Sequence, residues 1–175
     1  MPINLNGNTP STFSANIRSE NEGTSGSSGQ GQVVGYQQGT WTAQLEQGTI
    51  DSRNSTWTRI GNRVEIIAYL TTFSVRGTTD SVRVTNTSLP YQPVLPSENI
   101  TIGSCICTRV GQQPNAVGMG TSGNIRFERT GADIDSTSRA TTHDDLGAAN
   151  SIIAFTASYI TNDTTWTPSA GAALT

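Results

Sequence analysis

Apolar residues that recur at every second position constrain the fold of this chain more than any other feature. The pattern is clearest over residues 63–73, where Val64, Ile66, Ala68 and Leu70 share one face and Glu65, Ile67 and Tyr69 the other. Successive side chains of a β-strand point to opposite faces, so this pattern predicts a strand with one buried face. Residues 152–160 repeat it with Ile153, Phe155, Ala157 and Tyr159, and residues 100–110 with Ile100, Ile102 and Ile106 opposite Cys105 and Cys107.

Shorter strands are predicted at residues 41–45, 56–60, 81–85, 117–119 and 124–128. Residues typical of turns separate them, at Gly61-Asn62, 77–80, 90–96, 111–115 and 121–124. Ile, Val and Thr together number 50, against 7 Leu, which favours pleated sheets over helices. A parallel sheet needs crossover helices, and none is indicated. The sequence therefore predicts an all-β fold, an antiparallel β-sandwich or jelly-roll-like domain.

The first 38 residues differ from the rest. No large apolar side chain occurs from Arg18 to Gln32, and this Gly/Ser-rich stretch is typical of a tether that spans roughly 20 Å. Residues 1–17 nevertheless carry the large apolar side chains Ile3, Leu5, Phe13 and Ile17, which we expect to bind a partner surface. We divide the chain into an extended N-terminal arm with its tether (1–38) and a sandwich domain (39–175). A simply frayed terminus is the alternative.

Charge and hydropathy exclude several classes of protein. The net charge is −3 and the pI about 5.0, which disfavours a nucleic-acid-binding surface. No stretch approaches the 18 apolar residues of a membrane span, and the N-terminus has no basic start followed by an apolar run, so we expect neither a membrane anchor nor a secretion signal.

Residues with catalytic or ligand chemistry form no recognisable site. His143, the only histidine, lies in Thr-His-Asp-Asp, which fits either a divalent-cation ligand or, as we favour, an exposed loop histidine. The 13 carboxylates show no acid–base spacing, and no nucleophile elbow or phosphate loop occurs. Cys105 and Cys107 lie about 7 Å apart on one face of a strand, too far for a disulfide, and we expect two buried or half-buried thiols. We therefore expect no catalytic residues, no cofactor and no metal, and a protein that is not an enzyme.

All three tryptophans occur in Thr-Trp-Thr triplets, centred on Trp41, Trp57 and Trp166. On a strand, such a triplet places a large ring on one face and two hydroxyl side chains on the other. The triplets therefore indicate anchors in the core or at the edge of the sandwich. An exposed platform on which sugars stack is the alternative.

Four short motifs occur in a suggestive order: Gly39-Thr-Trp-Thr42, Trp57-Thr-Arg-Ile-Gly-Asn-Arg-Val64, Ser88-Leu-Pro-Tyr91 and a final strand ending at Ser158-Tyr159. Over about residues 39–160 the chain resembles a small β-sandwich module of tailed-bacteriophage virion proteins, found in head decoration proteins and at the ends of tail fibres. The module's usual pattern is G-T-W-T-P, Y-T-K-I-G-N-x-V and G-L-P-F. This chain departs from it mildly, at Ala43, Trp57, Arg59, Ser88 and Tyr91. The resemblance implies a sandwich fold without catalytic residues of its own.

The resemblance leads us to expect a structural virion protein, a capsid decoration or cement protein assembled in the host cytoplasm and bound to the outer head surface. The expected partners are the major capsid protein, contacted by the arm, and two further copies in a homotrimer. The alternative is a small tail-fibre or baseplate component that contacts host glycans through Trp41, Trp57, Trp166 and Tyr91. A depolymerase or peptidoglycan hydrolase is a third, weaker hypothesis.

Overall fold

Strands account for most of the described chain. The computed structural model describes residues 35–111, 113–129, 139–147, 150–169 and 172–175. Its strands are β1 (Tyr36–Trp41), β2 (Asp51–Ile60), β3 (Arg63–Thr71), β4 (Arg83–Val84), β5 (Ile100–Thr108), β6 (Ala116–Met119), β7 (Ile125–Arg129), β8 (Arg139–Ala140), β9 (Ile152–Ile160) and β10 (Ala172–Leu174). Two 3-10 turns are η1 (Asn86–Ser88) and η2 (His143–Asp145). Within the described ranges, no helix is long and apolar enough to cross a membrane.

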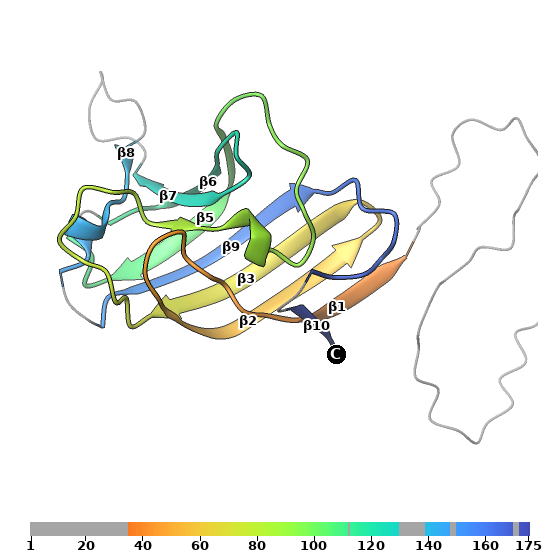
Figure 1. The fold of residues 1–175 in the computed structure, drawn as a ribbon, viewed down its shortest axis with the longest axis horizontal. Helices are drawn as coiled ribbons and strands as arrows, with labels where there is room; N and C mark the ends of the chain where they lie inside the picture. Colours follow the sequence, from red (N-terminus) through yellow and green to blue (C-terminus); the bar gives the residue numbers. More distant parts are fainter. Residues whose placement is uncertain (1–34, 112, 130–138, 148–149, 170–171) are drawn as a thin grey trace, which may run out of the picture.

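These strands form one antiparallel sheet in the order β10-β1-β2-β3-β9-β5-β6-β7-β4, with β8 paired to β7. The sheet is curled, and β6 and β7 lie away from the layer that contains β1, β2 and β3 (Figure 1). Its edge strand β4 is tied back to the segment after β1 by a bridge between Leu45 and Val84, where the Glu46 amide donates to the Arg83 carbonyl at 3.0 Å. The predicted all-β, antiparallel, sandwich-like fold is confirmed, and both layers belong to one continuous sheet.

The core lies inside the curl, where the predicted alternation of β3 and β9 is confirmed. Val64, Ile66 and Leu70 are fully buried, whereas Ile67 on the opposite face is 51% exposed. On β9 the inward set, Ile153, Phe155, Ala157 and Tyr159, is buried as predicted. Because β3 and β9 pair over eight residues in register, these two strands present one continuous apolar face to the core.

β5 departs from the predicted pattern. Cys105 and Cys107 are buried, while Ile106 is 76% exposed, so the cysteine face is the one that meets the core. The expected single isoleucine face is wrong, because a bulge between Thr101 and Gly103 shifts the register and turns Ile102 toward the core. The expectation of two buried, free thiols is confirmed.

The N-terminal edge of the sheet differs from expectation in position. β1 begins at Tyr36, so the expected boundary between residues 38 and 39 falls inside this strand. The sequence predicts a strand at 41–45, whereas β1 covers residues 36–41 and shares only Trp41 with that range. Before Trp41, β1 has a single buried position, and glycine occupies it. A Cβ atom on Gly39 would lie 1.7 Å from the Ala173 carbonyl oxygen, so glycine there permits close pairing with β10. Residues 1–34 of the expected arm and tether lie outside the described residues.

We predict that Gly103→Ala destabilises the domain by about 3 kcal/mol, the upper end of the cost of overpacking. An added Cβ would lie 2.0 Å from the carbonyl oxygen of Thr156, a backbone atom that cannot move without breaking the pairing of β5 with β9. Urea unfolding measures the loss. Gly120→Ala is the matched control, because its nearest neighbour, Asn99 Oδ1, is 3.7 Å away. Equal stability of the two variants would contradict the close approach.

Candidate functional site

A buried arginine stands at the centre of the most connected group of polar side chains. Arg59 occupies an inward position of β2, and its side chain is 2% exposed. Its guanidinium carbon lies 4.3 Å from the ring centre of Tyr91 and 3.8 Å from that of Trp166. Both rings therefore offer the cation their negative faces, an arrangement that arginine adopts more readily than lysine.

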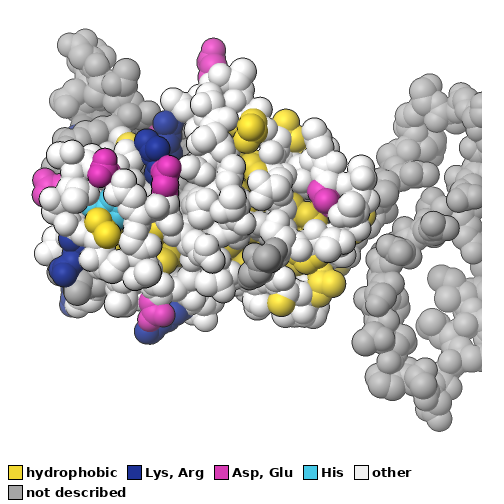
Figure 2. Space-filling model, viewed as in Figure 1, with side chains coloured by type: hydrophobic (Ala, Val, Ile, Leu, Met, Phe, Trp, Pro, Cys, Tyr) yellow, Lys and Arg dark blue, Asp and Glu magenta, His cyan; other side chains and the backbone are white. Residues whose placement is uncertain are grey.

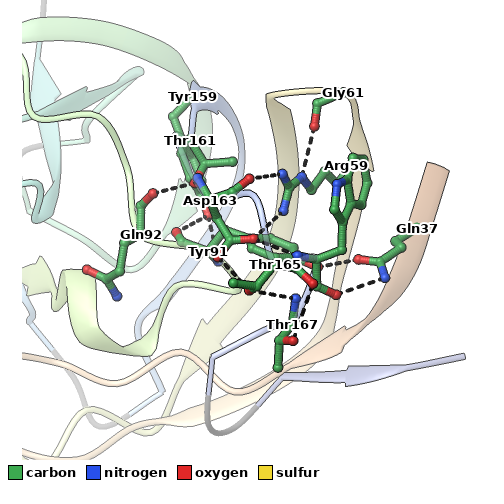
Figure 3. A network of polar contacts seen from close by, with 11 residues as sticks. Gln37, Arg59, Gly61, Tyr91, Gln92, Tyr159, Thr161, Asp163, Thr165 and Thr167 are labelled. Atoms are coloured by element: carbon green, nitrogen blue, oxygen red, sulfur yellow. Dashed lines mark hydrogen bonds and ion pairs between the residues drawn. The ribbon is translucent and has the colours of Figure 1, made fainter. Parts of the chain in front are cut away.

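Every nitrogen of this guanidinium donates a hydrogen bond (Figure 3). Arg59 Nε donates to the Gly61 carbonyl at 2.9 Å, Nη1 donates to Asp163 Oδ1 at 2.9 Å, and Nη2 donates to the Asp163 carbonyl. The Asp163 carboxylate also accepts from the Trp166 amide and the Thr165 hydroxyl, each at 2.9 Å. Burial acts to raise the pKa of Asp163, but hydrogen bonds from Arg59, Thr165 and the Trp166 amide hold it below its usual value.

Two tyrosines extend the group, which we call the Arg59 cluster (Gln37, Arg59, Tyr91, Tyr159, Asp163 and Trp166). Tyr159 Oη donates to the Tyr91 carbonyl at 2.9 Å, and Tyr91 Oη donates to Gln37 Oε1. Gln37 Nε2 donates to the Trp166 carbonyl at 3.0 Å. Burial raises the pKa of both tyrosines, so both stay neutral phenols at neutral pH. The cluster thus fastens the segments around Tyr91 and Trp166 to β1, β2 and β9.

The four sequence motifs meet at this cluster. The indole of Trp57 donates to the Thr40 carbonyl at 3.1 Å and packs edge-on against Tyr91, with ring centres 5.5 Å apart. Gly39 leaves room for the same indole, because an added Cβ would lie 2.9 Å from it. Gly39, Trp57 and Tyr91 therefore contact one another inside the fold.

The aromatic side chains act mainly as structural anchors. Trp41 is 3% exposed, Trp57 2% and Tyr91 1%, while Trp166 is half-buried against Arg59. The prediction of core anchors is confirmed for Trp41 and Trp57. As a result, three of the four rings expected to face a glycan in the alternative hypothesis cannot present a ring face to a ligand.

His143 is buried in η2, at 1% exposure, so the expectation of an exposed loop histidine is wrong. Its Nδ1 lies 3.0 Å from the Val75 carbonyl, and the loop after β3 folds against η2 through a bond from the Asp144 amide to the Thr78 carbonyl at 2.7 Å. Such packing depends on residues about 65 positions away and leaves no local pattern in the sequence. Across the described residues, no group of three or more His, Cys, Asp or Glu side chains is placed to hold a metal ion.

The two buried thiols influence each other, and their hydrogen bond lowers the pKa of the Cys105 thiol. Cys105 Sγ donates to the Ala116 carbonyl at 3.6 Å. Its hydrogen bond with Cys107, together with burial, raises the pKa of the Cys107 thiol above its usual range. Because the thiolate is the nucleophilic form, the raised pKa makes Cys107 the less reactive thiol of the two.

The four residues predicted to bind a partner, Ile3, Leu5, Phe13 and Ile17, lie outside the described residues. The structure adds a feature that the sequence did not indicate, a groove of about 600 Å³ between the start of β5 and the end of β9. Its rim includes Val94, Leu95 and Ile160. The sequence indicates only a turn at residues 90–96, and the signal for a groove is the presence of apolar side chains in this connecting segment.

No protein-family model matches this chain, and neither a curated protein nor a solved structure matches it.

We predict that Arg59→Lys lowers the free energy of unfolding by about 2 kcal/mol. A lysine ammonium cannot donate to Gly61 and Asp163 together while lying flat between two rings. Arg53→Lys is the control, because Arg53 pairs with Asp51 at 2.8 Å while both side chains are more than half exposed. We expect the control to shift stability by less than about 0.5 kcal/mol. Urea unfolding of both variants makes the comparison, and equal losses would contradict a structural role for the cluster.

The Asp163 carboxylate is expected to contribute to stability only when it is ionised. Its folded pKa lies below the unfolded value of 3.8, so the contribution is present above that pH and is lost as pH falls through the folded pKa. We predict that Asp163→Asn is less stable than wild type at neutral pH, and that the gap narrows below about pH 4. Thermal unfolding across this range tests the prediction. A gap that stays constant down to pH 2 would contradict it.

Proposed function

We propose that this chain is a structural component of a tailed-bacteriophage virion, a decoration protein that binds the outer head surface without catalytic activity. The observation that carries the proposal is the convergence of the four resemblance motifs on the Arg59 cluster. Among the motif side chains, Tyr91 contacts both Trp57 and Arg59, and these two donate hydrogen bonds to backbone carbonyls. Motifs used in this way specify a fold, which is what a module reused in different virion positions requires.

The surface of the domain fits a protein that contacts other proteins. Charged residues make up 13% of the chain, and the outward positions of β9 and β5 include Thr156, Ser104 and Ile106. Hydroxyl and apolar side chains lose less solvation free energy on burial than charged ones do, which favours extensive contact surfaces. The proposed partners are the major capsid protein and further copies of the chain in a trimer.

A tail location with glycan binding receives less support. Trp41, Trp57 and Tyr91, which that hypothesis would place in an exposed groove, are buried. The half-buried Trp166 stacks on Arg59 and holds its place in the cluster. The head-surface proposal is therefore the one we pursue.

The experiment that tests the proposal locates the protein on intact phage particles with a gold-labelled antibody. Label distributed evenly over the head supports decoration. Label confined to the tail overturns it and transfers the chain to the adsorption apparatus.

We predict that Phe13→Asp raises the dissociation constant for decoration-free capsids by at least about tenfold, since burying one phenylalanine contributes about 1.5–3 kcal/mol. Phe13 belongs to the arm proposed to contact capsid subunits. Thr12→Asp places the same charge one residue away and is the matched control. Co-sedimentation with capsids measures both. Equal affinities of Phe13→Asp and wild type would contradict binding through the arm.

A further inference from the structure

The groove between β5 and β9 is apolar and open to solvent. Val94 is 42% exposed, Leu95 56% and Ile160 44%, and the buried Tyr159 lies among the lining residues. Arg63 is the only charged residue among the described residues that line the groove, and its Nε donates to Ser158 Oγ at 2.8 Å. A cleft with this lining suits an uncharged apolar occupant.

Exposed apolar side chains concentrate at this end of the sheet. Nine large hydrophobic residues are exposed within the described ranges. Four of them line the groove: Val94, Leu95, Ile100 and Ile160. Two more, Tyr36 and Ile60, form a pair on the neighbouring strands β1 and β2. Figure 2 shows the same asymmetry, because the arginines visible on this face lie in its left half and the larger hydrophobic areas lie in the half where β1 begins.

The start of β1 lies close to the groove. Tyr36 pairs with Ile60, Ile60 with Arg63, and Arg63 with Ile160, so these four residues form one row across four strands. Directly paired residues share a face of the sheet, and three strand spacings amount to about 14 Å. The chain before residue 36 thus begins within about 14 Å of the groove's edge.

The segment that precedes β1 has matching chemistry and sufficient length. Residues 1–17 contain no charged side chain, and their large apolar side chains include Ile3, Leu5, Phe13 and Ile17. The Gly/Ser-rich stretch that follows spans roughly 20 Å, more than the distance to be covered. No other part of the chain outside the described residues combines uncharged and large apolar residues over such a length.

We propose that residues 1–17 bind the groove of their own chain, with their apolar side chains on Val94, Leu95 and Ile160. The arm is then stored on its own domain in the free protein. This inference goes beyond the proposed function, because it concerns the free protein and holds whether or not the chain belongs to a virion. If the chain is a decoration protein, the arm leaves this groove when it engages the capsid.

Trypsin provides a direct test on the full-length protein. Arg18 is the only arginine before Arg53, and the chain has no lysine, so a single cut reports on the arm. Cleavage of a bound segment follows the population of its open form, and we expect Leu95→Asp to speed cleavage at Arg18 by about tenfold. Ile106→Asp, a charge on an exposed residue of β5 outside the groove, should leave the rate unchanged.

A variant of the arm keeps the test decisive even if a groove variant unfolds. Phe13→Asp changes none of the described residues of the sheet and should speed cleavage as much as Leu95→Asp, while Thr12→Asp should not. Wild type cleaved as fast as both variants would overturn the proposal. So would acceleration by Ile106→Asp alone, because the arm would then bind the outer face of the sheet elsewhere.

Cysteine cross-linking decides which chain supplies the arm. In dilute solution, oxidation of the double variant Ser11→Cys and Ser97→Cys should give cross-linked monomers, since Ser97 follows the rim residues Leu95 and Pro96. Ser11→Cys with Thr79→Cys, in the loop beyond the far end of β3, should cross-link several times more slowly. Covalent dimers as the main product would overturn binding within one chain.

Discussion

A guanidinium held between two aromatic rings fixes one end of this sheet, and much of the remaining architecture depends on it. Removing an arginine charge from water costs several kcal/mol unless hydrogen bonds and an opposite charge replace the lost solvation. Arg59 receives both, from Asp163 and from the Gly61 carbonyl. This compensation requires the segment after β9 to fold back over β2. The fold-back places the ring of Trp166 against the guanidinium, and the Trp166 carbonyl accepts a hydrogen bond from Gln37 of β1. One buried charge thereby joins strands from both ends of the chain.

The curl of the sheet solves the problem that exposed strand edges present. An unpaired edge is a template for association with other chains, and native proteins shorten, charge or cover such edges. At one end of the order, β4 has two residues and is bridged to Leu45, beside the exposed pair of Arg83 and Glu46. At the other end, β10 has three residues and covers β1. The longest strands, β2, β3, β5 and β9, are all interior, so each of them pairs with a strand on either side.

Local alternation predicted the interior of the sheet well and its periphery poorly. β3 and β9 alternate cleanly because one face packs on the core and the other meets solvent. The same reasoning fails for β5, because a bulge between Thr101 and Gly103 shifts its register. Gly103 also lies against the Thr156 carbonyl, 53 residues away in sequence, and local alternation does not report such a contact. The burial of His143 depends in the same way on a distant loop. The motifs around Trp57 and Tyr91 were visible in the sequence, but their convergence on Arg59 required the fold, because a cation–π contact leaves no periodic signal.

The groove and the Arg59 cluster share a residue, Tyr159. Tyr159 lines the groove, and its hydroxyl is bonded to the Tyr91 carbonyl inside the cluster. The rim residue Val94 donates a hydrogen bond from its backbone amide to the Ile160 carbonyl at 2.8 Å, and the nearby Gln92 carbonyl accepts from the Thr161 hydroxyl at 2.7 Å. A groove whose floor and rim are fixed in this way is formed before any occupant arrives, so binding loses little free energy to ordering. The buried charge of Arg59 therefore also helps to position the groove in which the N-terminal segment is proposed to lie, because Arg59 packs on Tyr91 and Tyr91 is hydrogen-bonded to the groove residue Tyr159.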